Sequence, residues 1–192
     1  MGRLSAVGKL SIAQPANANS ASRMFGGIRI WAPDDAILDQ GLEELRGAIT
    51  EVLAENPTVD KRSLLYTAGA KLGEKIEKRV LGGVLGEELR EGRADAVPCA
   101  SLEHKTFRVY VSSASVAVFR ARVEDIQRRL ADSSSGSLLI REVRELHFGG
   151  KDKQGAWTCA SHLVGRLVHI GMAVYVDRYR IAWPKEIARA LI

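Results

Sequence analysis

Cysteine and histidine side chains are the first residues in this sequence that could carry chemistry. Cys159 and His162 are one helical turn apart, and His169 follows about two turns later, so a helix could place all three on one face. With Cys99 they would make up a four-ligand zinc set. The paired Cys-x-x-Cys spacing typical of structural zinc sites is absent from the sequence. We therefore predict no metal site and interpret these side chains as core residues.

Cys159 and His162 could also act as a nucleophile and its base, because positions i and i+3 of a helix are neighbours. Nothing in the sequence identifies a third group to orient the histidine, or donors for an oxyanion. The glycine-rich residues 82–86 follow a predicted helix and lack the lysine of a phosphate-binding loop. We therefore predict no enzymatic activity and no cofactor. A Cys99–Cys159 disulfide is left open, and free buried thiols are the simpler interpretation.

Basic side chains form the second group of candidates. Four arginines, Arg120, Arg122, Arg128 and Arg129, lie on the polar side of a predicted helix over residues 116–130. The Gly-rich loop 149–155 holds two lysines that could contact phosphates. Acidic residues alternate with the arginines, so a salt-bridged surface and a solvated loop are the simpler interpretations. With the basic residues of the N-terminal segment, the candidate nucleic-acid or partner contacts are Arg3, Lys9, Arg23, Arg128, Arg129, Lys151 and Lys153.

The net charge of +5 is concentrated at the N-terminus. Four basic residues and no acidic one precede Asp34, and subtracting these four from the total of 28 leaves 24 basic against 23 acidic residues in the rest of the chain. A nearly neutral body argues against nucleic acid as the main partner. The hydrophobic content of 46% is enough for a core and excludes a wholly disordered chain. Two cysteines exclude a disulfide-dense secreted scaffold.

The N-terminal segment is rich in Ala, Ser, Asn and Gly, with scattered apolar residues. Three interpretations are open: a mobile tail, a mitochondrial presequence, or an arm that becomes ordered on a neighbouring subunit or an acidic partner. The segment lacks the apolar stretch of a secretory signal, so we expect a virion or cytoplasmic protein. We predict a flexible basic arm over residues 1–27 and a single α+β domain over residues 28–192.

Apolar residues at helical spacing predict two helices in the first half of the chain. The first begins after Pro33 and stops at Asn56-Pro57. The second begins at Asp60 and stops at residues 82–83, and a short helix over residues 84–90 follows. The apolar stripes of the two long helices are Leu38, Leu42, Leu45, Ile49 and Val52, and then Leu65, Ala68, Leu72, Ile76 and Val80.

The second half alternates between strand and helix patterns. Residues 107–111 alternate as a strand, and residues 116–130 follow as a helix. Residues 138–148 are interpreted as a strand whose alternation slips between Ile140 and Val143, at a bulge. A helix over residues 157–170, a strand over residues 172–176 and a short helix after Pro184 complete the chain. We predict an α+β fold, with an N-terminal helical pair followed by a β-α-β-α-β core and a short C-terminal helix.

Part of the chain matches a family pattern. The residues concerned are 84–89 (VLGEEL), 107–113 (FRVYVSS), 126–130 (IQRRL) and 140–143 (IREV), together with Phe119. Residues 83–148 thereby resemble the DciA-type replicative helicase loader family. The resemblance implies a KH-like domain with a β-α-β core, in a family that binds nucleic acid and the helicase. A tryptophan expected near residues 81–84 is absent, and the region after Phe148 has no counterpart, so no functional residue is carried over.

These observations favour a non-enzymatic structural protein that assembles into a larger particle. By analogy of class, we expect a component of the connector, neck or tail of a bacteriophage virion. The supporting features are the N-terminal segment, the small residues within 68–73, and the tryptophans Trp31, Trp157 and Trp183. The expected partners are further copies of the chain or neighbouring protein subunits, with no membrane. The alternative is a KH-like nucleic-acid-binding adaptor resembling a helicase loader.

Overall fold

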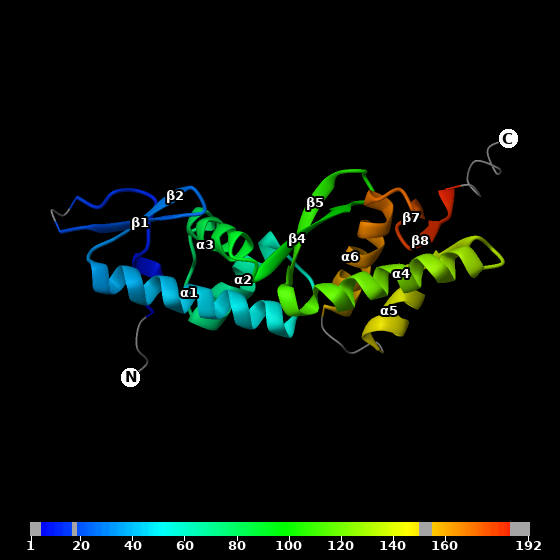
Figure 1. The fold of residues 1–192 in the computed structure, drawn as a ribbon, viewed down its shortest axis with the longest axis horizontal. Helices are drawn as coiled ribbons and strands as arrows, with labels where there is room; N and C mark the ends of the chain where they lie inside the picture. The colour runs from blue at the N-terminus through cyan, green and yellow to red at the C-terminus, as the bar shows by residue number, and fades with distance from the viewer. Residues whose placement is uncertain (1–4, 17–18, 150–154, 185–192) are drawn as a thin grey trace. The chain divides into compact units, whose positions relative to one another are not determined.

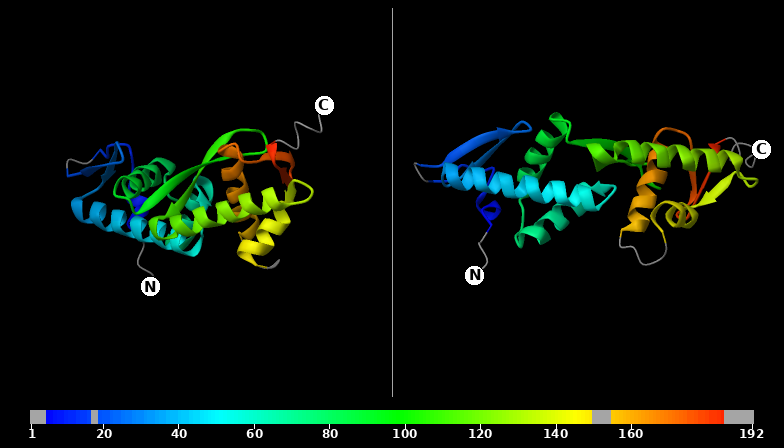
Figure 2. Two further views of the ribbon diagram at one scale, coloured as in Figure 1. Left: turned by 45° about the vertical axis from the view of Figure 1, so that its right-hand side comes forward. Right: turned by 60° about the horizontal axis from the view of Figure 1, so that its bottom comes forward.

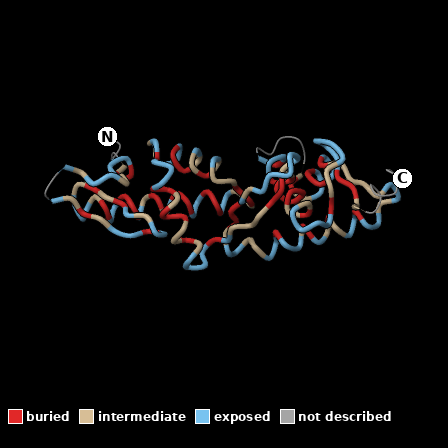
Figure 3. Tube along the Cα trace, turned by 90° about the horizontal axis from the view of Figure 1, so that it is seen from above, coloured by how far each residue is buried: buried red, intermediate tan, exposed pale blue. Residues whose placement is uncertain are grey.

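The computed structural model describes residues 5–16, 19–149 and 155–184 (Figure 1). The fold is α+β, as predicted. Contacts between Cα atoms divide the chain into two compact units, where the sequence had suggested one domain over residues 28–192. Unit 1 comprises the described residues of 1–56 and 60–95, and unit 2 those of 57–59 and 96–192. Each unit has buried stretches of its own, coloured red in Figure 3.

Unit 1 is a β-hairpin packed with three α-helices. Its elements are the 3-10 helix η1 (Val7–Lys9), the strands β1 (Ala21–Phe25) and β2 (Ile28–Ala32), and the helices α1 (Asp35–Glu55), α2 (Lys61–Leu72) and α3 (Lys78–Arg90).

Helix α1 follows the sequence prediction closely. Asp34 caps it, because its carboxylate accepts the N–H of Ile37 at 2.8 Å. The whole predicted stripe from Leu38 to Val52 is buried. The helix ends where Asn56 donates both its backbone N–H and its side-chain amide to the carbonyl of Val52.

The predicted second helix is two helices. Asp60 caps α2 as expected, accepting the N–H groups of Arg62 and Ser63 at 2.8 and 3.0 Å. The break falls at Gly73, whose φ of +69° is the left-handed conformation that ends a helix. Residues 82–83, which the sequence suggested as the end, lie inside α3. The helical spacing of apolar residues continues from Leu72 to Ile76 and Val80, so the sequence pattern gave no sign of the break at Gly73.

The described part of the expected N-terminal arm is packed structure. Val7 and Leu10 are buried, and Ser5 Oγ and the Ala6 N–H donate to Glu44 of α1 at 2.7 and 2.8 Å. The strands β1 and β2 then form an antiparallel hairpin, seen side by side in Figures 1 and 2. A flexible arm over residues 1–27 is therefore incorrect for residues 5–16 and 19–27. Of the apolar side chains that looked scattered in the sequence, Val7, Leu10 and Phe25 are buried.

Unit 2 contains three α-helices and most of two three-stranded sheets in its described residues, and the strand residues Asp60, Ala94 and Asp95 belong to unit 1. The first sheet has the order β3-β5-β4 and the second the order β6-β8-β7. The elements are β3 (Val59–Asp60), β4 (Ala94–Ala100), β5 (Thr106–Ser112), the 3-10 helix η2 (Ser113–Ser115), α4 (Val116–Asp132), β6 (Ser137–Leu139), α5 (Ile140–Phe148), α6 (Ala156–His169), β7 (Val174–Asp177) and β8 (Arg180–Ala182).

Several predictions in this half are confirmed. The strand over residues 107–111 lies within β5, and the helix over residues 116–130 is α4, whose Phe119, Val123, Ile126 and Leu130 are buried. The helix over residues 157–170 is α6, and the strand over residues 172–176 overlaps β7. The helix expected after Pro184 lies outside the described residues.

The strand predicted over residues 138–148 is wrong. Only Ser137–Leu139 are extended, and Ile140–Phe148 form α5. The buried Ile140, Val143 and Arg144 are spaced three and four apart, which is helical spacing and not a bulge. Moreover, β5 and β6 belong to different sheets, so the β-α-β core expected from the family resemblance does not form around α4.

Candidate interaction site

The predicted contact residues fall in different places. Arg128 and Arg129 are neighbours on α4 in unit 2, and both line one groove. Lys9 is exposed in η1, and Arg23 lies on β1, both in unit 1. The structure brings only Arg128 and Arg129 to one site. Arg3, Lys151 and Lys153 lie outside the described residues.

The groove runs between α4 and α5 and has a volume of about 930 Å³. Its floor contains Ile126 and Val143, which are buried, and the half-buried Leu138 of β6. Leu146 of α5 also lines the groove, and 45% of its surface is exposed. The site therefore offers apolar surface with one accessible leucine, which suits a side chain from another protein.

The two arginines of the groove are paired with one carboxylate. Arg129 Nε donates to Asp125 at 2.9 Å, and Arg128 lies 3.5 Å from the other carboxylate oxygen. The bond from Arg129 is the main reason that the pKa of Asp125 lies below its ordinary value. Asp125 therefore offsets part of the positive charge of these two guanidinium groups, which remain more than half exposed.

The remaining charges of the groove are acidic. Asp132, Glu142 and Glu145 line it together with Asp125, so four carboxylates stand against two arginines. Glu142 accepts the N–H of Leu139 at 2.8 Å and thereby caps α5. A lining with this balance repels a polyanion, so the groove is a poor site for nucleic acid.

Sequence reasoning missed Leu146 and the groove itself. Both depend on α5, which had been interpreted as a strand. A helix could have been predicted here, because Ile140, Val143 and Arg144 are at helical spacing and Glu142 is placed to cap the first turn. Such a helix would put Leu146 on its outer face, beside Glu142 and Glu145.

The cysteine and histidine constellation is part of the core of unit 2. The Cys99 thiol donates to the carbonyl of His162 at 3.4 Å, and the Cys159 thiol donates to the carbonyl of Thr58 at 3.8 Å. Thr58 Oγ1 lies 2.9 Å from His162 Nδ1 in the same buried cluster. Both cysteines are buried and unbonded to each other. His169 is exposed at the end of α6, so it is not part of this buried cluster.

This cluster does not have the properties of a nucleophilic site. Burial raises the pKa of the Cys99 thiol to about 12, so the thiolate is scarce near neutral pH. No group of three potential metal ligands occurs among the described residues. The placement agrees with core thiols held by backbone carbonyl groups.

A third arrangement in unit 2 bears on nucleic-acid binding. The elements from α4 to β8 follow the order helix, strand, helix, helix, strand, strand, and the three strands form a sheet in the order β6-β8-β7. This is the order of elements in a winged helix-turn-helix unit. In such a unit the second helix of the pair, here α6, enters the major groove of DNA. It must therefore have a free face.

The surface of α6 is largely covered. A Cβ atom at Gly165 would lie 2.8 Å from the carbonyl oxygen of Ala100, so the backbone of β4 lies directly on this helix. Arg166 donates to the carbonyl of Pro98 at 3.2 Å on the same strand. Its other face, with Leu163 and Leu167, packs into the core. Docking of α6 into a DNA groove would require β4 to move away.

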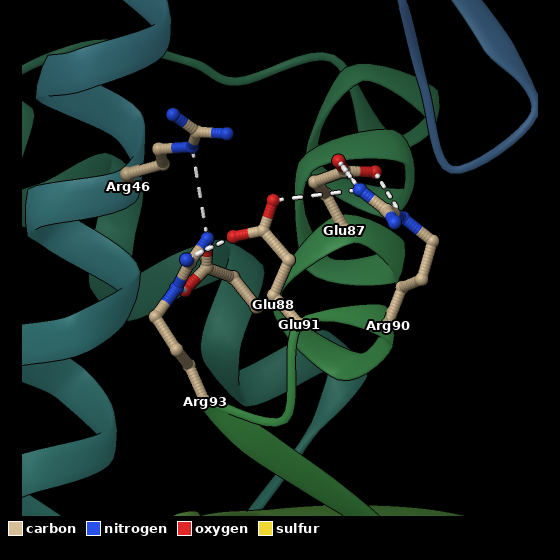
Figure 4. Close-up of polar contacts among 6 residues, drawn as sticks. All are labelled: Arg46, Glu87, Glu88, Arg90, Glu91 and Arg93. Carbon is tan, nitrogen blue, oxygen red and sulfur yellow. Dashed lines mark hydrogen bonds and ion pairs between the residues drawn. The ribbon is translucent and has the colours of Figure 1, made fainter.

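Unit 1 has a polar cluster of a different kind (Figure 4). Glu88 of α3 is buried, and both of its carboxylate oxygens accept hydrogen bonds from Arg93, at 2.6 and 2.7 Å. Arg46 of α1 lies 3.6 Å from the same carboxylate. On the far side of α3, Glu87 accepts from Arg90. Each acid has an arginine, so the cluster links α1 and α3 through paired charges.

No protein-family model matches this chain, and no curated protein matches it. None of the helices in the described part of the chain is long and apolar enough to cross a membrane.

Proposed function

We propose that the protein is a non-enzymatic assembly subunit that binds a neighbouring protein chain through the groove between α4 and α5. The observation that carries the proposal is the apolar floor of this groove beside a charged rim in which Arg128 and Arg129 pair with Asp125. Such a surface contributes apolar contact from Leu138 and Leu146, and pairing with Asp125 limits the cost of burying the two arginines.

The charge of the groove favours protein over nucleic acid as its partner. Association through Leu146 rests on apolar contact, which tolerates moderate salt, whereas binding to phosphates weakens steeply as salt rises. The particle that we propose is a homo-oligomeric or mixed assembly of the bacteriophage connector, neck or tail class. This last step rests on an analogy of class.

The test compares two exposed apolar residues of unit 2. Leu146 lines the groove and is 45% exposed, whereas Val118 of α4 is 51% exposed and does not line it. Leu146→Lys is expected to shift the concentration at which the chain associates, measured by size-exclusion chromatography with light scattering. Val118→Lys is the matched control and should associate as the unchanged chain does. Equal association of both variants would contradict a role for the groove.

The alternative, a nucleic-acid-binding adaptor, is favoured by one specific feature. The β7–β8 hairpin that follows the helix-turn-helix pair carries the exposed Arg178 and Arg180, and Arg178 lies over the ring of Tyr179 at 4.5 Å. If nucleic acid were the partner, binding would fall with salt at a log–log slope near −0.9 for each duplex phosphate neutralised. Micromolar or tighter duplex binding that Arg178→Glu with Arg180→Glu abolishes in a folded chain would support this alternative.

A further inference from the structure

The hairpin of unit 1 has an open edge along β1 in the part of the chain that the structure describes. In its register, Ser22 is opposite Trp31 and Met24 is opposite Arg29. Trp31 exchanges both backbone hydrogen bonds with Ser11, at 2.7 and 2.9 Å, on the side of β2 away from β1. Backbone groups alternate in direction along an antiparallel pair, so those of Ser22 and Met24 point away from β2 as well. They have no backbone partner among the described residues.

The other edge of the hairpin is covered at Trp31. Ser11 lies beside Trp31 as an isolated bridge, so β2 has a neighbour on each side at that position, whereas the outward backbone groups of Arg29 have no backbone partner among the described residues. This leaves β1 as the edge strand, with the N–H and carbonyl groups of two residues free to pair with an added strand. An unpaired edge of this kind is a template for strand addition.

The turn next to the open edge is packed against α3. Gly26 and Gly27 form a two-residue turn with φ values of +51° and +79°, which suits a tight hairpin. The turn lies against α3 at glycines: a Cβ atom at Gly83 would be 3.0 Å from the carbonyl of Phe25, and one at Gly86 would be 3.3 Å from Gly26 Cα. A pre-organised edge loses little conformational entropy when a strand is added.

Arginines flank the edge on both faces. Arg29 reaches across the hairpin and donates to Ser22 Oγ at 3.2 Å, on the face that also carries Met24, which is 53% exposed. Arg23 is on the other face of β1, and its guanidinium contacts Asp39 of α1 at 2.7 Å. No acidic residue precedes Asp34 in the sequence. A second copy of β1 would therefore bring like charges together, whereas an acidic strand would complement them.

We propose that β1 takes up an extended acidic segment of a partner protein as an additional strand. The backbone of Ser22 and Met24 supplies the hydrogen bonds, Met24 supplies apolar contact, and Arg29 pairs with a carboxylate of the added strand. The proposal concerns unit 1 alone and goes beyond the proposed role of the groove in unit 2. Failure of one would leave the other standing.

The experiment uses the full chain with two synthetic peptides of alternating sequence. One is acetyl-TVEVEVT-amide, and the control is acetyl-TVKVKVT-amide. Amide hydrogen exchange and chemical shifts of the labelled protein report on the edge. In the free chain, the amides of Ser22 and Met24 should exchange faster than those of Arg23 and Phe25, which are bonded to β2. The acidic peptide should protect Ser22 and Met24, and the basic peptide should not.

Two substitutions at one position separate the backbone contribution from that of the side chain. Met24→Pro removes the N–H that points away from β2 together with the methionine side chain, so the hairpin should survive while peptide affinity falls by about tenfold or more. Met24→Thr retains the N–H and should bind within a few-fold of the unchanged chain. Chemical shifts of α1 and α3 show whether each variant remains folded.

Three results would overturn the proposal. The first is protection of Ser22 and Met24 in the free chain at every concentration, because the edge would already be covered. The second is equal binding of both peptides, or binding that Met24→Pro leaves unchanged. The third is protection that grows with protein concentration without peptide, because the occupant would then be a second copy.

Discussion

Glu88 and Arg93 form a two-point ion pair at the end of α3, with the carboxylate buried and the guanidinium about half exposed (Figure 4). The paired carboxylate raises the pKa of Arg93 above its ordinary value. Arg46 approaches the same carboxylate from α1. One acid thus organises two arginines from different parts of unit 1.

Removal of this acid should destabilise unit 1. Glu88→Ala leaves the partly buried Arg46 without its counter-charge and breaks two charge-assisted bonds, so we expect a loss of about 1–3 kcal/mol in the free energy of unfolding. Urea denaturation measures it. Glu103→Ala is the control, because the pair of Glu103 with Lys105 is exposed on both sides and should contribute about 0–1 kcal/mol. Equal losses would show that burial of Glu88 is unimportant.

Gly83 and Gly47 form a second matched pair. Both lie inside helices, but a Cβ atom at Gly83 meets the carbonyl of Phe25 at 3.0 Å, whereas one at Gly47 meets nothing within 4 Å. Gly47→Ala should therefore stabilise the protein by about 0.5–1 kcal/mol through helix propensity. Gly83→Ala should gain less or lose stability, because the hairpin must shift. The difference between the two melting temperatures is the test.

The sequence predicted elements well where apolar spacing was long and uninterrupted. The stripes of α1 and α4 each extend over several turns and are buried as expected. Prediction failed where short elements follow each other without a break in the apolar pattern. The helix α5 is nine residues long and follows a three-residue strand directly, so its first apolar residues continued the alternation.

The hairpin and the groove were missed for different reasons. Gly26-Gly27 between two short alternating runs is a hairpin signal that the polar composition of the segment concealed. The groove is a tertiary feature, because Leu138 and Leu146 meet Ile126 only once α5 packs beside α4. Of the seven predicted contact residues, Arg128 and Arg129 could be placed at a site, but their pairing with Asp125 depends on the structure.

Phe119 should be a major contributor to the stability of unit 2. It is 5% exposed and belongs to the core cluster with Val111 and Ile126. Phe119→Ala is expected to cost about 3–5 kcal/mol, since it removes a buried ring and leaves a cavity. Its neighbour Val118 is 51% exposed, and Val118→Ala should change stability by less than about 0.5 kcal/mol. Chemical denaturation of both variants checks the prediction, and a loss below about 1 kcal/mol for Phe119→Ala would contradict it.

His147 should make the stability of unit 2 depend on pH. Its side chain is largely buried at the end of α5, and this burial lowers its pKa from the ordinary 6.5, against the opposing effect of Asp125 at 3.6 Å. Arg122 and Arg129 of α4 lower it further. The unfolded chain therefore takes up a proton at a higher pH than the folded chain does. The free energy of unfolding should fall as pH decreases from 6.5 towards the lower pKa of the folded state, and level off below it.

His147→Gln removes the titrating group, so the variant should lose this part of the pH dependence while retaining a polar side chain. Urea midpoints measured at several pH values, for the unchanged chain and the variant, give the comparison. Identical pH profiles would show that His147 does not titrate differently in the two states.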